Sequence, residues 1–248
     1  MSLRLARYHV HLFEWHSRTF HPFDEVLSDL ELDYLDASFH MADKADERPR
    51  TGYRHFSYYT YSHRVAGTGV NSTRLAYGTL SKPKQLWPKA KLVIEERGLD
   101  LERALPRHED LGFYGLGWDL AAAQLKVYFR VPDVLALPGS YADLLTLRPA
   151  VHRAEGLVSA SFVGPEMVER KVYFYPLGDD TEDRSLRTVL MSTTARGRIA
   201  QLDVPGSDAW RSELSPPGQH IVDLYASIGE SLDTIAFDDP DHFTLYFP

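Results

Sequence analysis

The sequence contains no cysteine, and this absence excludes several kinds of chemistry at once. No disulfide can form, no thiolate can act as a nucleophile, and no zinc ion or iron–sulfur cluster can be bound through sulfur. Long apolar runs are also missing, since none approaches the roughly 20 residues that a membrane-spanning helix needs. The N-terminal segment carries His9, His11 and Glu14 where a signal peptide would have an uninterrupted apolar stretch. We therefore expect a cytoplasmic protein.

Basic residues are in short supply relative to acidic ones. The chain has 27 Lys and Arg against 35 Asp and Glu, which gives a formal net charge of −8. This balance argues against nucleic acid or an anionic membrane as the main partner, although it permits a local basic site. Aromatic residues are plentiful, with 14 Tyr and 12 Phe in 248 residues. A chain of this length fits one large barrel or two small domains.

Along the chain, expected antiparallel hairpins alternate with expected helices. The hairpins are predicted at residues 111–120 with 124–131, 156–163 with 169–175, 187–194 with 197–204, and 234–237 with 243–247, after strands at 7–15, 55–61 and 72–80. Helices are predicted at 23–30, 82–105, 132–153 and 217–232, and the polar segment 42–51 is predicted to be a loop. Rossmann and TIM architectures alternate single strands with helices, so the hairpins disfavour both. They favour an α+β fold with one closed antiparallel sheet, because closure leaves no exposed strand edge.

A short strand pattern recurs in the second half of the chain. Residues 125–129 read LKVYF, residues 170–174 read RKVYF, and residues 243–247 read FTLYF. Successive side chains of a strand face opposite ways, so each copy has one apolar face and one polar face. The polar faces comprise Lys126, Tyr128 and Arg130 in the first copy, Lys171, Tyr173 and Tyr175 in the second, and Thr244 and Tyr246 in the third.

The position of the helices decides which way these polar faces point. If helices cover the outside of a barrel, the apolar faces pack against them and the cations and phenols line the interior. Lysine and arginine bind diphosphate oxygens, and an aromatic face stabilises a carbocation, so such an interior suits the ionisation of an allyl diphosphate. The alternative is that the same alternation belongs to strands whose polar face simply meets solvent.

Residues 115–129, GLGWDLAAAQLKVYF, resemble a hairpin of the aromatic prenyltransferases of the ABBA, or PT-barrel, fold. That family includes indole, phenol and cyanobactin-type peptide prenyltransferases, and the resemblance extends over about residues 110–176. It implies a closed antiparallel barrel of about ten strands surrounded by helices, formed by residues 1–248 as a single domain. It also implies transfer of a prenyl group from dimethylallyl or geranyl diphosphate to an aromatic small molecule or peptide. No cofactor is required in such an enzyme, and Mg²⁺ is optional.

The resemblance further implies roles for individual residues. The diphosphate would be bound by Lys126, Lys171 and, on an earlier strand, Arg74. The cation would be shielded by Tyr128, Tyr173 and Tyr246, and Arg130 and Tyr175 would extend the same faces by one step. The carboxylate that orients the acceptor would be Glu14 or Asp119, and Asp119 would also fit a cap of the hairpin turn that follows it.

Two further motifs suggest metal binding but stand in unsuitable contexts. Residues 179–183, DDTED, match the DDxxD pattern of helical isoprenoid synthases, yet here they fall on an expected loop of a strand-rich chain. His9 and His11 share one face of an expected strand, whereas Glu14 and His16 fall on the other. We therefore expect no resident metal site.

Two other functions remain open at the level of sequence. A wide barrel with an aromatic interior can carry a hydrophobic small molecule without catalysis. A cofactor-independent cyclase is the third hypothesis, and it needs a buried acid–base pair that the sequence does not identify. Paired cations on interior faces would favour the prenyltransferase, because a carrier of apolar ligands seldom needs them.

Overall fold

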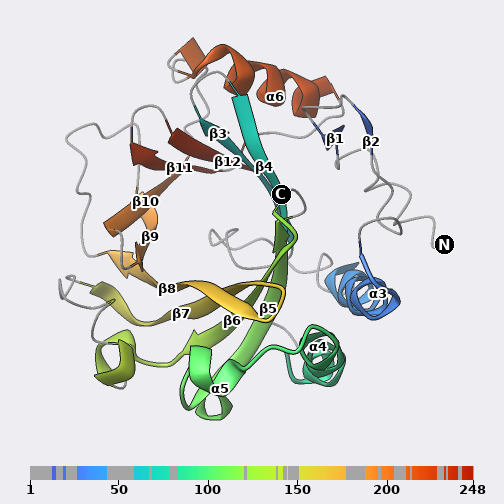
Figure 1. Cartoon of the computed structure of the whole chain (residues 1–248). Helices are drawn as coiled ribbons and strands as arrows, with labels where there is room; N and C mark the ends of the chain where they lie inside the picture. Colours follow the sequence, from blue (N-terminus) through green and yellow to red (C-terminus); the bar gives the residue numbers. More distant parts are fainter. Residues whose placement is uncertain are drawn as a thin grey trace.

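The computed structural model shows a ring of ten strands with helices on its outside (Figure 1). It describes residues 13–14, 19–20, 27–43, 59–66, 69–78, 83–119, 122–137, 139–141, 144, 151–176, 188–194, 197–203, 211–212, 214–227, 232, 234–239 and 242–247. Each of the ten strands pairs antiparallel with the next one in the chain, and the last pairs with the first. The expected closed antiparallel barrel is therefore confirmed by the strand pairing itself.

The barrel strands run in simple up-and-down order. They are β3 (Tyr59–Ala66), β4 (Gly69–Gly78), β5 (Gly112–Asp119), β6 (Gln124–Val131), β7 (Val151–Val163), β8 (Glu166–Pro176), β9 (Thr188–Thr194), β10 (Gly197–Asp203), β11 (Thr234–Asp239) and β12 (His242–Phe247). A separate two-stranded ribbon is made by β1 (Phe13–Glu14) and β2 (Thr19–Phe20). The helices are α3 (Asp29–Asp43), α4 (Pro83–Glu96), α5 (Leu101–Ala104) and α6 (Pro216–Ser227).

The core lies between the outer face of the barrel and the helices. On β6 the side chains alternate, with Leu125, Val127, Phe129 and Val131 buried and the residues between them more accessible. The ring centroids of Phe129 and Trp87 on α4 are 5.7 Å apart, so the buried face packs outward against this helix. Burial of such aromatic and aliphatic side chains contributes roughly 2 kcal/mol each to stability. The opposite face of β6 therefore points into the barrel.

Helix α6 covers another part of the outer face. The hydroxyl of Tyr225 on α6 lies 2.7 Å from Nε2 of His63 on β3. The Tyr225 ring also stacks on Phe247 of β12, with ring centroids 3.8 Å apart. These contacts fasten α6 across the two strands that close the barrel, β12 and β3.

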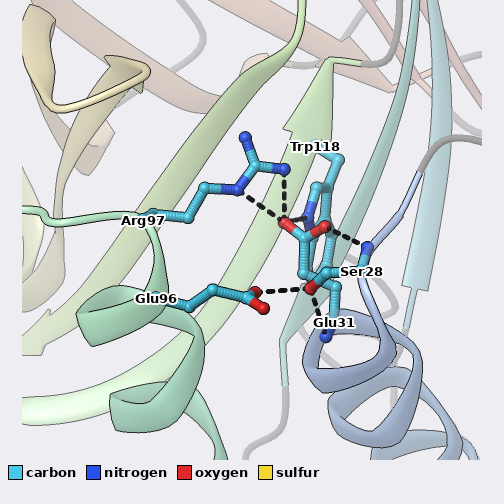
Figure 2. Close-up of polar contacts among 5 residues, drawn as sticks. All are labelled: Ser28, Glu31, Glu96, Arg97 and Trp118. Carbon is cyan, nitrogen blue, oxygen red and sulfur yellow. Dashed lines mark hydrogen bonds and ion pairs between the residues drawn. The ribbon is translucent and has the colours of Figure 1, made fainter.

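A buried carboxylate fastens α3 and α4 to β5 (Figure 2). Glu31 on α3 is fully buried, and its Oε1 accepts hydrogen bonds from Nη2 of Arg97 at 2.7 Å and from Nε1 of Trp118 on β5 at 2.8 Å. The same residue forms a capping box, because the Ser28 amide donates to Glu31 Oε2 at 2.9 Å and the Glu31 amide donates to Ser28 Oγ at 3.3 Å. The Ser28 hydroxyl donates in turn to Glu96 at the end of α4. One glutamate thus links a helix start, a neighbouring helix and the barrel wall.

The expected hairpins agree with the structure, whereas the expected helix 132–153 does not. Residues 132–153 were expected to be helical, but the structure has two short 3₁₀ turns, Val134–Ala136 and Gly139–Tyr141, and β7 already begins at Val151. The β-branched and aromatic residues after 150 favour the longer strand. Of the expected helix 23–30 the structure describes residues 27–30, and α3 begins there at Asp29 because Ser28 supplies the N-cap. Helix α3 ends at Asp43, so it includes the start of the polar segment 42–51. Of the expected strand 7–15, the structure describes only Phe13–Glu14.

Candidate active site

The inward faces of β6, β7 and β8 bring the two Lys-x-Tyr motifs together. Lys126 on β6 lies opposite Ser161 on β7, and Tyr128 lies opposite Ser159. On the far side of β7, these two serines lie opposite Glu169 and Lys171 of β8. The small serine side chains leave space between the longer side chains of β6 and β8. The expectation that both motifs share the barrel interior is therefore consistent with the register.

The ammonium of Lys126 lies among aromatic groups. Its Nζ donates a hydrogen bond to the Tyr173 hydroxyl at 2.8 Å. The same atom lies 5.4 Å from the ring centroid of Tyr128 and 5.5 Å from that of Tyr173, within the range of cation–π attraction. Two tyrosines, one on its own strand and one two strands away, therefore fix the position of this cation.

The groups around Lys126 remain accessible inside the barrel. Lys126, Tyr128 and Tyr173 keep part of their surface, whereas their outward-facing neighbours Val127 and Val172 are fully buried. The other neighbour of β6 also has small residues at these positions, because Gly117 and Gly115 of β5 are the register partners of Lys126 and Tyr128. Small residues on both neighbouring strands explain why the inward face is less tightly covered than the outward one.

Tyr114 extends the aromatic surface that Tyr128 and Tyr173 form beside Lys126. The Tyr114 and Tyr128 ring centroids are 6.4 Å apart in an edge-on arrangement, and those of Tyr128 and Tyr173 are 6.1 Å apart. Tyr114 and Leu157 form a small apolar cluster with Tyr128 and Tyr173 that is separate from the main core. The interior thus combines a cation with a continuous aromatic surface.

Lys171 is already paired with a carboxylate. Its Nζ lies 3.3 Å from Oε2 of Glu169, two residues earlier on the same face of β8. The Lys171 side chain is 14 % exposed and that of Glu169 is 30 % exposed. The interior patch formed by Lys126, Glu169 and Lys171 therefore contains two ammonium groups and one carboxylate.

The phenol of Tyr173 is held in its neutral form. Burial raises the pKa of Tyr173 well above its usual value, and the nearby Tyr246 phenol adds to the shift, whereas Ser159 opposes it. Tyr246 lies on β12, four strands away around the ring, and its neighbour Phe247 stacks on Tyr225 of the outer helix α6, so Tyr246 points to the interior. A neutral Tyr173 can accept the hydrogen bond from Lys126 and still donate one of its own.

Stability is expected to fall at high pH because two tyrosines, Tyr141 and Tyr173, have raised pKa values. Burial also raises the pKa of Tyr141 to about 12, and in the unfolded chain both phenols would ionise near pH 10. Above pH 10 the unfolded state loses protons that the folded state keeps. The free energy of unfolding is therefore unaffected by these tyrosines below pH 10 and decreases above it, by at most about 1.4 kcal/mol per pH unit for each tyrosine. Urea unfolding at pH 8 and pH 11 measures the loss, which Tyr173→Phe should reduce. An identical pH dependence in Tyr173→Phe and the unchanged protein would contradict this account.

The other expected site residues occupy varied positions. Asp119 is buried, and its Oδ1 accepts from the Ala122 amide at 3.3 Å, so it caps the hairpin turn as expected. Arg130 lies at an accessible end of β6, where its Nη2 pairs with Glu155 at 2.7 Å. Arg74 is placed by register alone, between Ser62 and Asp119.

Two expected residues are located only by their backbone. Tyr175 lies on β8, two positions beyond Tyr173. Glu14 lies on β1, in the two-stranded ribbon outside the ring, and not on a strand of the barrel (Figure 1). The structure therefore does not place Glu14 beside the Lys126 cluster. The DDTED segment and the N-terminal histidines His9, His11 and His16 lie outside the described residues.

Sequence reasoning missed Glu169, Ser159 and Ser161. The signal for Glu169 was present, because it lies two residues before Lys171 and so shares its face. The serines had no comparable signal, since their importance comes from pairing with β6 and β8. The Ser159 hydroxyl is fully buried and lies close enough to the Tyr173 phenol to oppose the rise in its pKa.

Comparisons with known proteins add a likeness in shape. No family model matches the sequence, and no curated protein matches it. Among solved structures, one titled "Crystal structure of NotF prenyltransferase" aligns with a TM-score of 0.48 and 11 % identity, covering 88 % of each chain.

Within the described part of the chain, no group of three histidine, aspartate or glutamate side chains lies close enough together to bind a metal ion. None of the described helices is long and apolar enough to cross a membrane.

Proposed function

We propose that this protein is an aromatic prenyltransferase of the ABBA, or PT-barrel, type. It would move a prenyl group from an allyl diphosphate to an electron-rich aromatic acceptor inside the barrel. The observation that supports this most is the Lys126 ammonium, hydrogen-bonded to Tyr173 and lying near two tyrosine rings while it remains accessible. A cation beside an aromatic wall suits a substrate with an anionic end and a carbon end that becomes cationic.

The diphosphate would bind to the cations of the inward face. Lys126 and Lys171 lie on strands separated only by β7, so both can reach one diphosphate. Ammonium groups form charge-assisted hydrogen bonds with phosphate oxygens and stabilise the negative charge that develops as the carbon–oxygen bond breaks. We propose that Arg74, two strands from β6 on β4, adds a third cation.

The allyl cation would be protected by the tyrosines. The faces of Tyr128, Tyr173 and Tyr114 offer the negative side of the aromatic quadrupole to a cation. Because Tyr173 stays neutral, it is a weaker nucleophile than a phenolate and captures the cation less readily. An aromatic wall also displaces water, which would otherwise convert the cation to an alcohol. Tyr246 would complete this wall from β12.

We propose that the reaction requires no resident cofactor. The cations of the chain can neutralise part of the diphosphate charge themselves, and Mg²⁺ would then assist without being essential. Assays with excess EDTA and with added Mg²⁺ compare the two conditions directly. Loss of all turnover in EDTA would overturn this part of the proposal.

The test is a direct assay for prenyl adducts. The protein is incubated with dimethylallyl, geranyl or farnesyl diphosphate and a panel of indoles, phenols and tyrosine- or tryptophan-containing peptides, and products are identified by mass. An adduct with the mass of one added prenyl group supports the proposal. Tight binding of aromatic compounds without diphosphate binding or turnover would instead favour a non-catalytic carrier, as the apolar contacts of Tyr114 and Leu157 allow.

A further inference from the structure

We propose that Glu169 accepts the proton released by the aromatic acceptor, and that Lys171 restrains this carboxylate until the diphosphate substrate binds. The inference rests on the proposed prenyl transfer and assigns a base to it. Glu169 lies beside the lysines that would bind diphosphate, and Lys171 would exchange Glu169 for the diphosphate as its partner.

Glu169 lies beside both lysines that would bind the diphosphate. It is level with Lys126 across the small Ser161, and its Oε2 lies 3.3 Å from Lys171 Nζ. It also acts electrostatically on Tyr173, which places it near the Lys126–Tyr173 hydrogen bond. Because 30 % of its side chain is exposed, Glu169 can contact a substrate without rearrangement of the neighbouring side chains.

Other carboxylates near the barrel are differently engaged. Asp119 accepts from the Ala122 amide in the β5–β6 turn, and Glu155 pairs with Arg130. Each of these roles ties the carboxylate to its own strand end or turn. Glu169 differs because Lys171, with which it forms an ion pair, is itself one of the cations that a diphosphate would bind.

The exchange of partners follows from charge. A diphosphate carries more negative charge than one carboxylate and would draw Lys171 toward itself. Glu169 would then lose its cation and gain an anion as a neighbour, and both changes favour the protonated form of a carboxyl group. The carboxylate therefore becomes a stronger base only when the prenyl donor is in place.

Prenyl transfer releases diphosphate and one proton from the two substrates. The carbon–oxygen bond of the allyl diphosphate breaks, and its electron pair leaves with the diphosphate. The aromatic carbon attacks the allyl cation and forms the new carbon–carbon bond. The proton on that carbon passes to a carboxylate oxygen of Glu169, and the ring regains its aromatic electrons. After diphosphate leaves, Glu169 returns its proton to water and pairs again with Lys171.

The experiment measures diphosphate binding and turnover separately on the full-length protein. Inorganic diphosphate, titrated by calorimetry in EDTA, reports binding, and the prenyl-adduct assay reports turnover. Glu169→Gln removes the competing charge, so diphosphate should bind roughly tenfold more tightly. The same variant lacks the base, so turnover should fall by about 100-fold or more. A structural role alone would not produce tighter binding together with slower turnover.

Matched controls come from an exposed ion pair outside the barrel. Asp33 on α3 pairs with Lys89 on α4, so Asp33→Asn and Lys89→Met repeat the charge changes of Glu169→Gln and Lys171→Met away from the interior. Both controls should leave binding and turnover unchanged. Lys171→Met should weaken diphosphate binding and reduce turnover. Glu169→Gln with unchanged turnover, or with weaker diphosphate binding, would overturn the inference.

A measurement on the unchanged protein avoids any dependence on a variant that folds poorly. A crystal structure with inorganic diphosphate should show Lys171 Nζ bound to the diphosphate and separated from Glu169. An intact Lys171–Glu169 pair beside bound diphosphate would overturn the inference while leaving prenyl transfer standing. Absence of both diphosphate binding and prenyl adducts in the unchanged protein would instead overturn the proposed function on which it rests.

Discussion

Lys126→Met is expected to weaken the binding of inorganic diphosphate by roughly 100-fold, which is the cost of removing one partner from a largely desolvated charge contact. Methionine keeps most of the length and apolar surface of lysine, so the packing between Tyr128 and Tyr173 is retained. Prenyl transfer should fall at least as far, because Lys126 would also stabilise the charge on the departing diphosphate. Calorimetry measures the first effect, and adduct formation under saturating acceptor measures the second.

The matched control for Lys126→Met is Lys89→Met, which removes an ammonium from the outer surface of α4. It should leave diphosphate binding unchanged, and urea unfolding should show that both variants remain folded. Equal diphosphate affinity in Lys126→Met and the unchanged protein would remove Lys126 from the proposed site and, with it, the observation that most supports prenyl transfer.

Glu31→Ala is expected to cost about 3–5 kcal/mol of stability, the range found when one partner of a buried ion pair is removed. The substitution leaves the Arg97 guanidinium and the Trp118 indole N–H without their acceptor, and it takes away one half of the capping box at Ser28. Urea unfolding at neutral pH measures the loss from the shift in midpoint. Glu31→Gln should lose less, because an amide oxygen can still accept a hydrogen bond.

Glu96 provides the comparison for Glu31, since it belongs to the same cluster but contacts the Ser28 hydroxyl at an exposed position (Figure 2). Glu96→Gln should therefore change stability by less than about 1 kcal/mol, as expected for accessible polar contacts. Similar losses in Glu31→Ala and Glu96→Gln would show that the buried carboxylate has no special part in joining α3 and α4 to the barrel.

The strand order of this barrel was largely predictable from sequence, and particular residues explain why. The alternation of Lys126, Tyr128 and Arg130 with Val127 and Phe129 fixes the two faces of β6, and a one-residue shift in register would exchange them. The same alternation on β8 predicts which side Lys171 and Tyr173 occupy. Short turns within the five hairpins favour antiparallel pairing of the two strands of each, and the longer connections between hairpins include α4, α5 and α6.

Interactions between distant segments were not predictable in this way. Trp118 bonds to Glu31, 87 residues earlier, and nothing near either residue in the sequence signals the other. The Ser-x-x-Glu capping box at Ser28 and Glu31 marks the start of α3, and the prediction of a helix over 23–30 did not use it.

The interior site likewise has features that the sequence predicts and features that it does not. Its cations and phenols follow from alternation, but their pairing depends on how β6, β7 and β8 are aligned. Sequence treats Lys126 and Lys171 as equivalent, whereas the structure gives Lys126 aromatic neighbours and Lys171 a carboxylate. This difference arises because the two motifs are offset across β7, so that Lys126 lies level with Glu169 and Tyr128 lies level with Lys171.

The pairing of β12 with β3 has a consequence for how the chain folds. His242 pairs with Ala66, whereas all other paired strands of the ring are consecutive in the chain, so this contact closes by far the longest loop of the ring. Closing a long loop costs more conformational entropy than forming a hairpin, and non-local pairings slow folding. Until β12 is seated, the edges of β3 and β11 are open to pairing with other chains and the tyrosine wall is open to water. The last barrel strand to be synthesised therefore determines when the interior first becomes a protected space.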